Sequence, residues 1–242
     1  MNHRIAIAYL SLLFPPLGIF CLAWAFIYST RTEYPSALVA LAFGIFSLGF
    51  VTMLALVAFR KVTSRVAFDD AGTTLRPDRN VDGVLMASTI AVFIAMALYA
   101  FFAPQDMIVI RMPNDNQRPF VIACIVGLLV GLPSMWHLLK QRGMSRLRMT
   151  VDGMEVGSAV STRSRTWKEV TDVSDRPRDG RRPSGTTYIT TADGHTRILP
   201  SDWYTPGGQA LRELVRFYWQ RPDAREELTD GRAVERLVRI QA

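Results

Sequence analysis

The chain has 242 residues, 49% of them hydrophobic, and a formal net charge of +7 at pH 7. The apolar residues are concentrated in the first 140 positions, which excludes a single soluble domain and indicates a membrane half followed by a soluble half. All basic residues except Lys61, Lys140 and Lys168 are arginines; this composition suits anionic partners but also arises from genome composition, so it identifies no ligand.

Two cysteines, Cys21 and Cys124, lie inside apolar runs and are interpreted as packing or lipid-facing residues. No CxxC or Cys/His spacing is present, so the sequence predicts neither a disulfide nor a metal site, and it indicates no cofactor.

Four apolar segments predict transmembrane helices, because about 20 apolar residues span the ~30 Å hydrocarbon core of a bilayer. None contains Asp, Glu, Lys or Arg, which favours an anchor over a proton-coupled pump. The first is too long for a signal-peptide core and should stay attached. The segments are residues 5–29, 37–59, 83–103 and 119–139.

Two features are predicted to shape helix packing. Pro15 and Pro16 remove backbone donors near mid-membrane, so we expect a kink or local unwinding of the first span; such a kink serves packing more often than gating. Gly127 and Gly131 form a GxxxG motif in the fourth span, which favours close helix packing within or between chains. A homo-oligomer is therefore possible but not specified.

The loop of residues 60–82 contains VAFDDAGTTL, which predicts two short strands around a glycine-containing turn. SRVAFDDAGTTL, beginning at Ser64, aligns without gaps with SRLRMTVDGMEV, beginning at Ser145, and the shared turn glycines are Gly72 and Gly153. This faint repeat suggests that a hairpin follows each helix pair and that the two hairpins could lie together.

Basic residues near the ends of the spans predict the orientation, because cytoplasmic loops carry an excess of Lys and Arg. One side holds ten and the other three, so we expect both termini in the cytoplasm and a multi-pass protein of the plasma membrane. The first side holds Arg4, Arg60, Lys61, Arg65, Arg76, Arg79, Lys140, Arg142, Arg146 and Arg148, and the other holds Arg31, Arg111 and Arg118.

After Lys140 the sequence predicts an α+β module. RLRMTVDGMEVG indicates a hairpin in which Asp152-Gly153 supplies the positive φ of a tight turn, and TTYITTADGHTRILP indicates another around Asp193-Gly194. An irregular strand between them has the apolar residues Trp167, Val170 and Val173. An amphipathic helix then begins near Thr205 and Pro206 and carries the apolar residues Leu211, Leu214, Val215 and Tyr218.

This order of hairpin, tryptophan-containing strand, basic loop, hairpin and closing helix resembles the bacterial pleckstrin-homology-like domains that follow transmembrane helix pairs in bacterial membrane proteins. The resemblance covers about residues 145–220. It implies a bent β-sandwich or barrel capped by a C-terminal helix, with a binding or assembly role and no catalytic residues. The chain is a strand or two short of a seven-stranded version. The expected domains are residues 1–141 in the membrane, residues 142–221 in the pleckstrin-homology-like domain, and a helical tail at residues 222–242.

Eight basic residues are candidate contacts for anionic headgroups, each contributing about 1 kcal/mol near an anionic membrane surface. The alternative is a solvated loop that Asp175 and Asp179 partly neutralise. No aromatic and basic interleaving accompanies the arginines, which argues against nucleic acid. The candidates are Arg176, Arg178, Arg181 and Arg182 in one loop and Lys140, Arg142, Arg146 and Arg148 after the fourth span.

No GxSxG, HExxH or phosphate-loop motif is present, and His195 at a hairpin turn is interpreted as a surface residue, so no enzyme is predicted. The sequence thus predicts a non-catalytic membrane protein whose cytoplasmic module binds lipid headgroups or a protein partner. The alternatives are a scaffold or assembly subunit of a membrane complex, and a small transporter or channel subunit.

Overall fold

The computed structural model describes residues 3–59, 61–110, 117–141, 143–158, 162–176 and 185–241, with the side chains of residues 12–140, 143–157, 162–176 and 185–241 within these ranges. The chain forms two compact units. The helical unit comprises Met1–Ala55 and Gly83–Gln141, and the sheet unit comprises Leu56–Asp82 and Arg142–Ala242.

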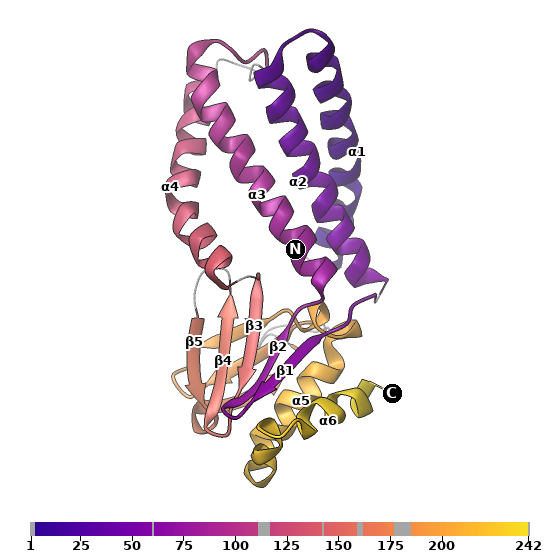
Figure 1. The fold of residues 1–242 in the computed structure, drawn as a ribbon, viewed down its shortest axis with the longest axis vertical. Helices are drawn as coiled ribbons and strands as arrows, with labels where there is room; N and C mark the ends of the chain where they lie inside the picture. Colours follow the sequence, from indigo (N-terminus) through magenta and orange to yellow (C-terminus); the bar gives the residue numbers. More distant parts are fainter. Residues whose placement is uncertain are drawn as a thin grey trace. The chain divides into compact units, whose positions relative to one another are not determined.

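The long helices alternate in direction along the chain (Figure 1). They are α1 (His3–Thr30), α2 (Tyr34–Ala58), α3 (Arg79–Phe102) and α4 (Gln117–Gln141). Within the described residues all four contain a stretch long and apolar enough to cross a membrane: Leu12–Thr30, Tyr34–Ala58, Arg79–Gln105 and Gln117–Lys140. By length and composition the chain is a multi-pass membrane protein, as predicted.

Of the two outcomes expected at Pro15 and Pro16, a kink or local unwinding, the unwinding is wrong, since α1 is helical through both residues; the kink stays a prediction. The neighbouring helix supports this turn: the Ser47 hydroxyl on α2 donates a hydrogen bond of 2.7 Å to the Phe14 carbonyl, directly before the prolines. Proline is tolerated in membrane helices where a neighbour supplies such polar contacts.

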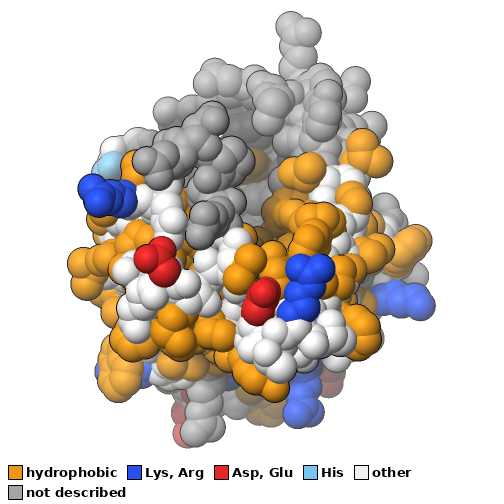
Figure 2. Space-filling view, turned by 90° about the horizontal axis from the view of Figure 1, so that it is seen from above, with side chains coloured by type: hydrophobic (Ala, Val, Ile, Leu, Met, Phe, Trp, Pro, Cys, Tyr) orange, Lys and Arg blue, Asp and Glu red, His pale blue; other side chains and the backbone are white. Residues whose placement is uncertain are grey.

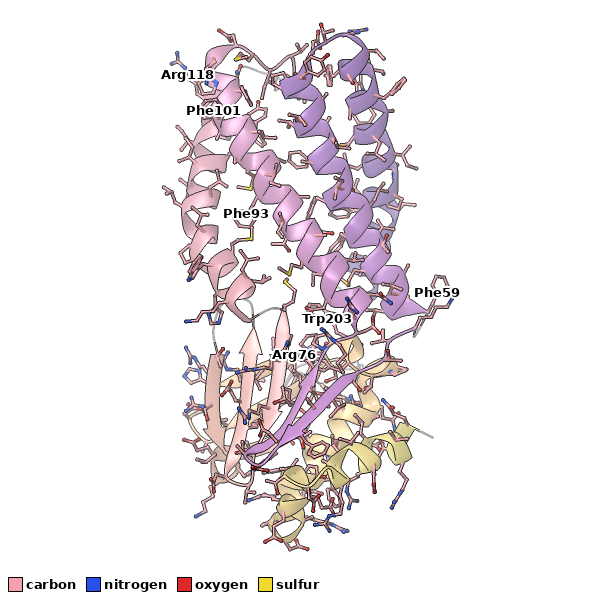
Figure 3. All side chains as sticks on the ribbon, viewed as in Figure 1. Phe59, Arg76, Phe93, Phe101, Arg118 and Trp203 are labelled. Atoms are coloured by element: carbon pink, nitrogen blue, oxygen red, sulfur yellow. The ribbon has the colours of Figure 1, made fainter. Side chains whose placement is uncertain are left out.

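Glycines mark where these helices approach most closely. A Cβ at Gly127 would lie 2.3 Å from Met96 Cε, and one at Gly131 would lie 2.2 Å from the ring of Phe93, so both α4 glycines accommodate α3 side chains. Phe93 is labelled on α3 in Figure 3. On the other side of α3, a Cβ at Gly49 of α2 would lie 2.0 Å from Ser88 Oγ. Small residues thus allow the close packing on which membrane helices depend.

The sheet unit contains two antiparallel sheets. The first has the order β1 (Arg65–Asp69), β2 (Gly72–Arg76), β3 (Ser145–Met149), β4 (Gly153–Ser158) and β5 (Thr162–Thr166). The second has the order β6 (Val170–Ser174), β7 (Thr187–Thr191) and β8 (Thr196–Leu199).

The hairpin from the loop between α2 and α3 completes the first sheet. In the pairing of β2 with β3, Thr73 lies opposite Met149 and Leu75 opposite Leu147, and all four are buried. The Thr73 hydroxyl donates to the Leu228 carbonyl at 2.6 Å. The expectation that the two hairpins lie together is therefore confirmed. Sequence analysis grouped residues 60–82 with the membrane domain, whereas β1 and β2 belong to the sheet unit, because the apolar face of β2 is buried in its core.

The turn between β3 and β4 differs from the predicted tight turn. Gly153 has no positive φ; it begins β4, where a Cβ would lie 2.2 Å from the Arg165 carbonyl oxygen of β5. Glycine is needed there for the close approach of two strands and not for turn conformation. Gly194, between β7 and β8, does have the expected positive φ, at 78°.

Helices at the C-terminal end cover the core. Pro206 opens a 3₁₀ turn, so α5 (Gln209–Gln220) begins three residues later than predicted, and its four predicted apolar residues are buried. A 3₁₀ segment at Pro222–Leu228 and α6 (Arg232–Gln241) follow. Leu228, Ala233 and Leu237 belong to the same buried cluster as the strands, so the core extends into the tail.

Candidate functional site

The predicted basic residues do not form one cluster among the described residues. Arg142, Arg178, Arg181 and Arg182 lie outside the described residues. Lys140 is exposed in the last turn of α4, in the helical unit. Arg176 is exposed directly after β6, with its Nε 3.8 Å from the Asp175 carboxylate.

Arg146 and Arg148 are paired with carboxylates. Both lie on the outer face of β3, because the residues that alternate with them, Ser145, Leu147 and Met149, are buried and point into the core. Arg146 forms an ion pair with Glu155 of β4. Arg148 donates to both carboxylate oxygens of Asp69 on β1, at 2.8 and 2.9 Å. Their charges are therefore balanced within the sheet.

Sequence analysis missed three arginines on the edge strands of the two sheets that share the strand register of core residues; Arg163 is exposed, and Arg165 and Arg197 are half-buried. On β5, Arg163 lies opposite Val156 and Arg165 opposite Met154. Residues directly opposite in an antiparallel pair share a face, so both arginine side chains leave the backbone on the core face of the first sheet. On β8, Arg197 lies opposite Ile189, which is buried, and so starts from the core face of the second sheet. We call Arg163, Arg165 and Arg197 the inward arginines.

The inward arginines influence one another electrostatically. Arg197 is half-buried, and its pKa is lowered by burial and by the positive charges of Arg163 and Arg165. Burial is the larger cause, and the contributions of Arg163 and Arg165 show that like charges lie near Arg197. An anion placed between these side chains would reduce that repulsion.

Only one of the three has carboxylate partners in the part of the chain that the structure describes. Arg165 donates to Asp193 in the turn between β7 and β8 at 2.8 Å and lies 3.9 Å from Glu169. The pKa of Asp193 is lowered, first by a hydrogen bond from the Thr191 hydroxyl and further by Arg165. Arg163 and Arg197 form no ion pair among the described side chains, so their guanidinium donors are available to a ligand.

The sequence contains a weak signal for this site. In TRSRT the arginines are two residues apart, which places both on one face of any strand. That this face is the inner one follows only from the pairing of β5 with β4. Arg197 is 34 residues after Arg163 and belongs to another sheet, so no local pattern connects the two.

Guanidinium groups bind carboxylates and phosphates in bidentate geometry, which makes the inward arginines a candidate anion site. Within the described ranges, no three His, Cys, Asp or Glu side chains lie close enough together to hold a metal ion. A comparison with protein-family models, curated proteins and solved structures finds no match to this chain.

Proposed function

We propose that this protein is a non-catalytic, membrane-anchored binding protein. Its sheet unit would be a pleckstrin-homology-like domain that binds the anionic headgroups of membrane lipids at the cytoplasmic face of the plasma membrane. The observation that carries the proposal is the set of inward arginines, two of which have no carboxylate partner among the described side chains.

The architecture supports the pleckstrin-homology-like assignment. The two antiparallel sheets and the amphipathic helix α5 follow one another in the order that the resemblance implies. The C-terminal segment alone has six strands, one fewer than the seven-stranded version, and β1 and β2 from the loop between α2 and α3 bring the total among the described residues to eight. The domain would thus be assembled from two separate pieces of the chain.

Short connections support action at the membrane surface. Three residues separate the end of α4 at Gln141 from β3 at Ser145, and six separate the end of α2 at Ala58 from β1 at Arg65. An extended chain covers at most about 3.6 Å per residue. The sheet unit is therefore held at a high local concentration relative to lipid headgroups, so that even weak individual contacts are effective.

The test uses the full-length chain purified in a neutral detergent. Binding of dioctanoyl-phosphatidylglycerol, dioctanoyl-phosphatidylcholine and inorganic phosphate is measured by microscale thermophoresis at low and moderate salt. We expect binding of the anionic lipid that weakens with salt, weaker binding of phosphate, and none of the zwitterionic lipid.

The matched variants separate the site from net charge. Arg163→Gln with Arg197→Gln removes two charge-assisted contacts of about 1.5–3 kcal/mol each, so affinity should fall at least about 100-fold. Arg232→Gln with Arg239→Gln removes the same charge from exposed positions on α6 and should leave affinity within about twofold. Equal losses in both double variants would contradict a specific site. If the chain shows no preference for the anionic lipid, lipid binding is refuted and a protein partner becomes the proposed ligand.

A further inference from the structure

The helical unit contains a second candidate site, independent of the sheet unit. A cavity of about 470 Å³ lies between the four long helices and the segment after α3 that contains Val109 and Ile110. Ligand pockets typically measure about 300–1,000 Å³, whereas packed interiors leave few voids larger than a water molecule. The cavity opens to the surface of the helical unit, and its volume lies within the range of ligand pockets.

Aromatic side chains form most of its wall. Six of the eleven lining residues are aromatic: Phe20, Trp24, Tyr28, Phe43, Tyr99 and Phe120. On α1 they form a ladder one turn apart, with ring centroids 6.0 Å apart for Phe20 and Trp24 and 5.2 Å apart for Trp24 and Tyr28. Across the cavity, Tyr99 of α3 and Phe120 of α4 form a T-shaped pair at 4.9 Å. Each wall is thus formed by aromatic rings in contact with one another.

The chemistry of the wall defines the ligand. None of the lining residues is charged, and the polar side-chain groups among them are the Cys21 thiol, the Trp24 indole N–H and two tyrosine hydroxyls. Most of the wall is apolar and therefore favours an apolar occupant, although the buried Tyr99 hydroxyl has no hydrogen-bond partner among the described residues. Phe20 is 59% exposed on the outer side of α1, so the wall reaches the surface that faces lipid. Figure 2, which views the molecule from above, shows mainly hydrophobic side chains among the described residues, with Lys, Arg, Asp and Glu as separate spots.

We propose that this cavity binds one hydrocarbon chain of a bilayer lipid, either an acyl or an isoprenoid chain. The chain would enter beside Phe20 and lie between the α1 ladder and the Tyr99–Phe120 pair. Flat aromatic walls suit such a chain because they provide many dispersion contacts without requiring hydrogen bonds. Trp24 and Tyr28, near the end of α1, are residues typical of the membrane interface, where the headgroup of the bound lipid would remain.

The first experiment measures lipid retained by the full-length chain through purification in a mild detergent, by native mass spectrometry. Ala40, which is buried and lines the cavity, is replaced in Ala40→Phe to fill it. Ala123→Phe adds the same atoms at an exposed position of α4 outside the lining and is the control. We expect one lipid per chain in the wild type and in Ala123→Phe, and at least fivefold lower occupancy in Ala40→Phe. The mass of the retained molecule distinguishes an acyl lipid from an isoprenoid.

Equal occupancy in all three chains, or none in the wild type, would overturn the proposal. If Ala40→Phe does not fold, a second measurement reads Trp24 in a cavity whose wall is unmodified. Fluorescence quenching by lipids with brominated chains is compared between Trp136→Phe, which keeps Trp24, and Trp24→Phe, which keeps the exposed Trp136; both variants share the signal of Trp167, Trp203 and Trp219 in the sheet unit. The labelled protein is then diluted into unbrominated lipid. Quenching of Trp24 should persist at ratios of unbrominated to brominated lipid at which quenching of Trp136 is lost. Parallel loss would show exchange with bulk lipid at both positions and would also refute the site.

Discussion

A comparison of Arg148 with Arg163 shows that the surroundings of a basic side chain, and not its residue type, decide whether it can bind a ligand. Arg148 has its carboxylate partner Asp69 a full 79 residues away, across an intervening strand. Arg163 has none among the described side chains. A count of basic residues near a span cannot distinguish these cases, because the partner is brought in by strand pairing. The prediction of a basic surface from composition therefore included residues whose charge is already balanced.

At the residue scale, Glu227 should be a stabilising carboxylate of the sheet unit. It accepts hydrogen bonds from Arg236 Nε and Nη2 at 2.8 and 2.7 Å and from the Tyr218 hydroxyl at 3.1 Å. Its pKa is lowered, mainly by the Arg236 hydrogen bonds. Because the folded-state pKa is lowered, the ionised carboxylate stabilises the fold at pH values above its ordinary pKa of about 4.3. This contribution is lost as the pH falls through the folded-state pKa.

Glu227→Gln should thus destabilise the protein by about 1–3 kcal/mol at pH 7. The difference from the wild type should shrink as the pH falls below about 4, when the wild-type carboxylate is protonated as well. Differential scanning fluorimetry of the full-length chain in detergent across this range measures both effects. Glu226→Gln, at the neighbouring exposed position, is the control and should stay within about 0.5 kcal/mol of the wild type. A pH-independent difference for Glu227→Gln would show that the charge is not the cause.

At the scale of elements, local patterns predicted the strands but not all of their partners. VAFDDAGTTL has the alternation and turn residues of a hairpin, and β1 and β2 form there. The pairing of β2 with β3 joins residues on either side of α3 and α4, about 70 positions apart. Only the faint similarity to the segment at Ser145 indicated it. At Gly153 the local pattern was misleading. The Asp152-Gly153 pair predicted a tight turn, whereas glycine is required there because the Arg165 carbonyl of β5 leaves no space for a Cβ.

This pairing predicts which soluble fragment folds. A fragment of residues 143–242 would expose the edge of β3 and lack Leu75 in the core. Residues 62–82 joined to residues 143–242 by a short Gly-Ser linker should restore both. A short linker is sufficient because the two ends to be joined lie side by side: the Met144 N–H donates to the Asp82 carboxylate at 2.7 Å. We expect the joined fragment to be monomeric and to unfold cooperatively, as measured by gel filtration and circular dichroism.

The fragment without the hairpin should aggregate or unfold without a cooperative transition, because an unpaired apolar edge strand promotes association. In the joined fragment, Leu75→Ala should cost about 2–5 kcal/mol, since the side chain is fully buried. Thr74→Ala on the same strand is less buried and is the control, with an expected cost below about 1 kcal/mol. Equal melting temperatures with and without residues 62–82 would show that the hairpin is not part of the domain.

At the scale of the whole molecule, hydropathy predicted the four helices to within about four residues at each end, because length and apolar composition alone define a span. Orientation rests on the distribution of basic residues, ten against three. It predicts that the turn between α1 and α2 is outside the cell and that β1 and β2 are inside.

Cysteine labelling tests this orientation in intact cells. In a chain with Cys21 and Cys124 replaced by serine, Thr32→Cys introduces a thiol in the exposed turn before α2, and Asp70→Cys introduces one in the exposed turn of the β1–β2 hairpin. Ser36 is unsuitable because it is buried and its hydroxyl accepts the Val109 N–H at 3.0 Å. A membrane-impermeant maleimide should label Thr32→Cys in intact cells and Asp70→Cys only after permeabilisation. The reverse pattern would place the sheet unit outside the cell, where the inward arginines would meet a different set of anions and the proposed function at the inner face would fail.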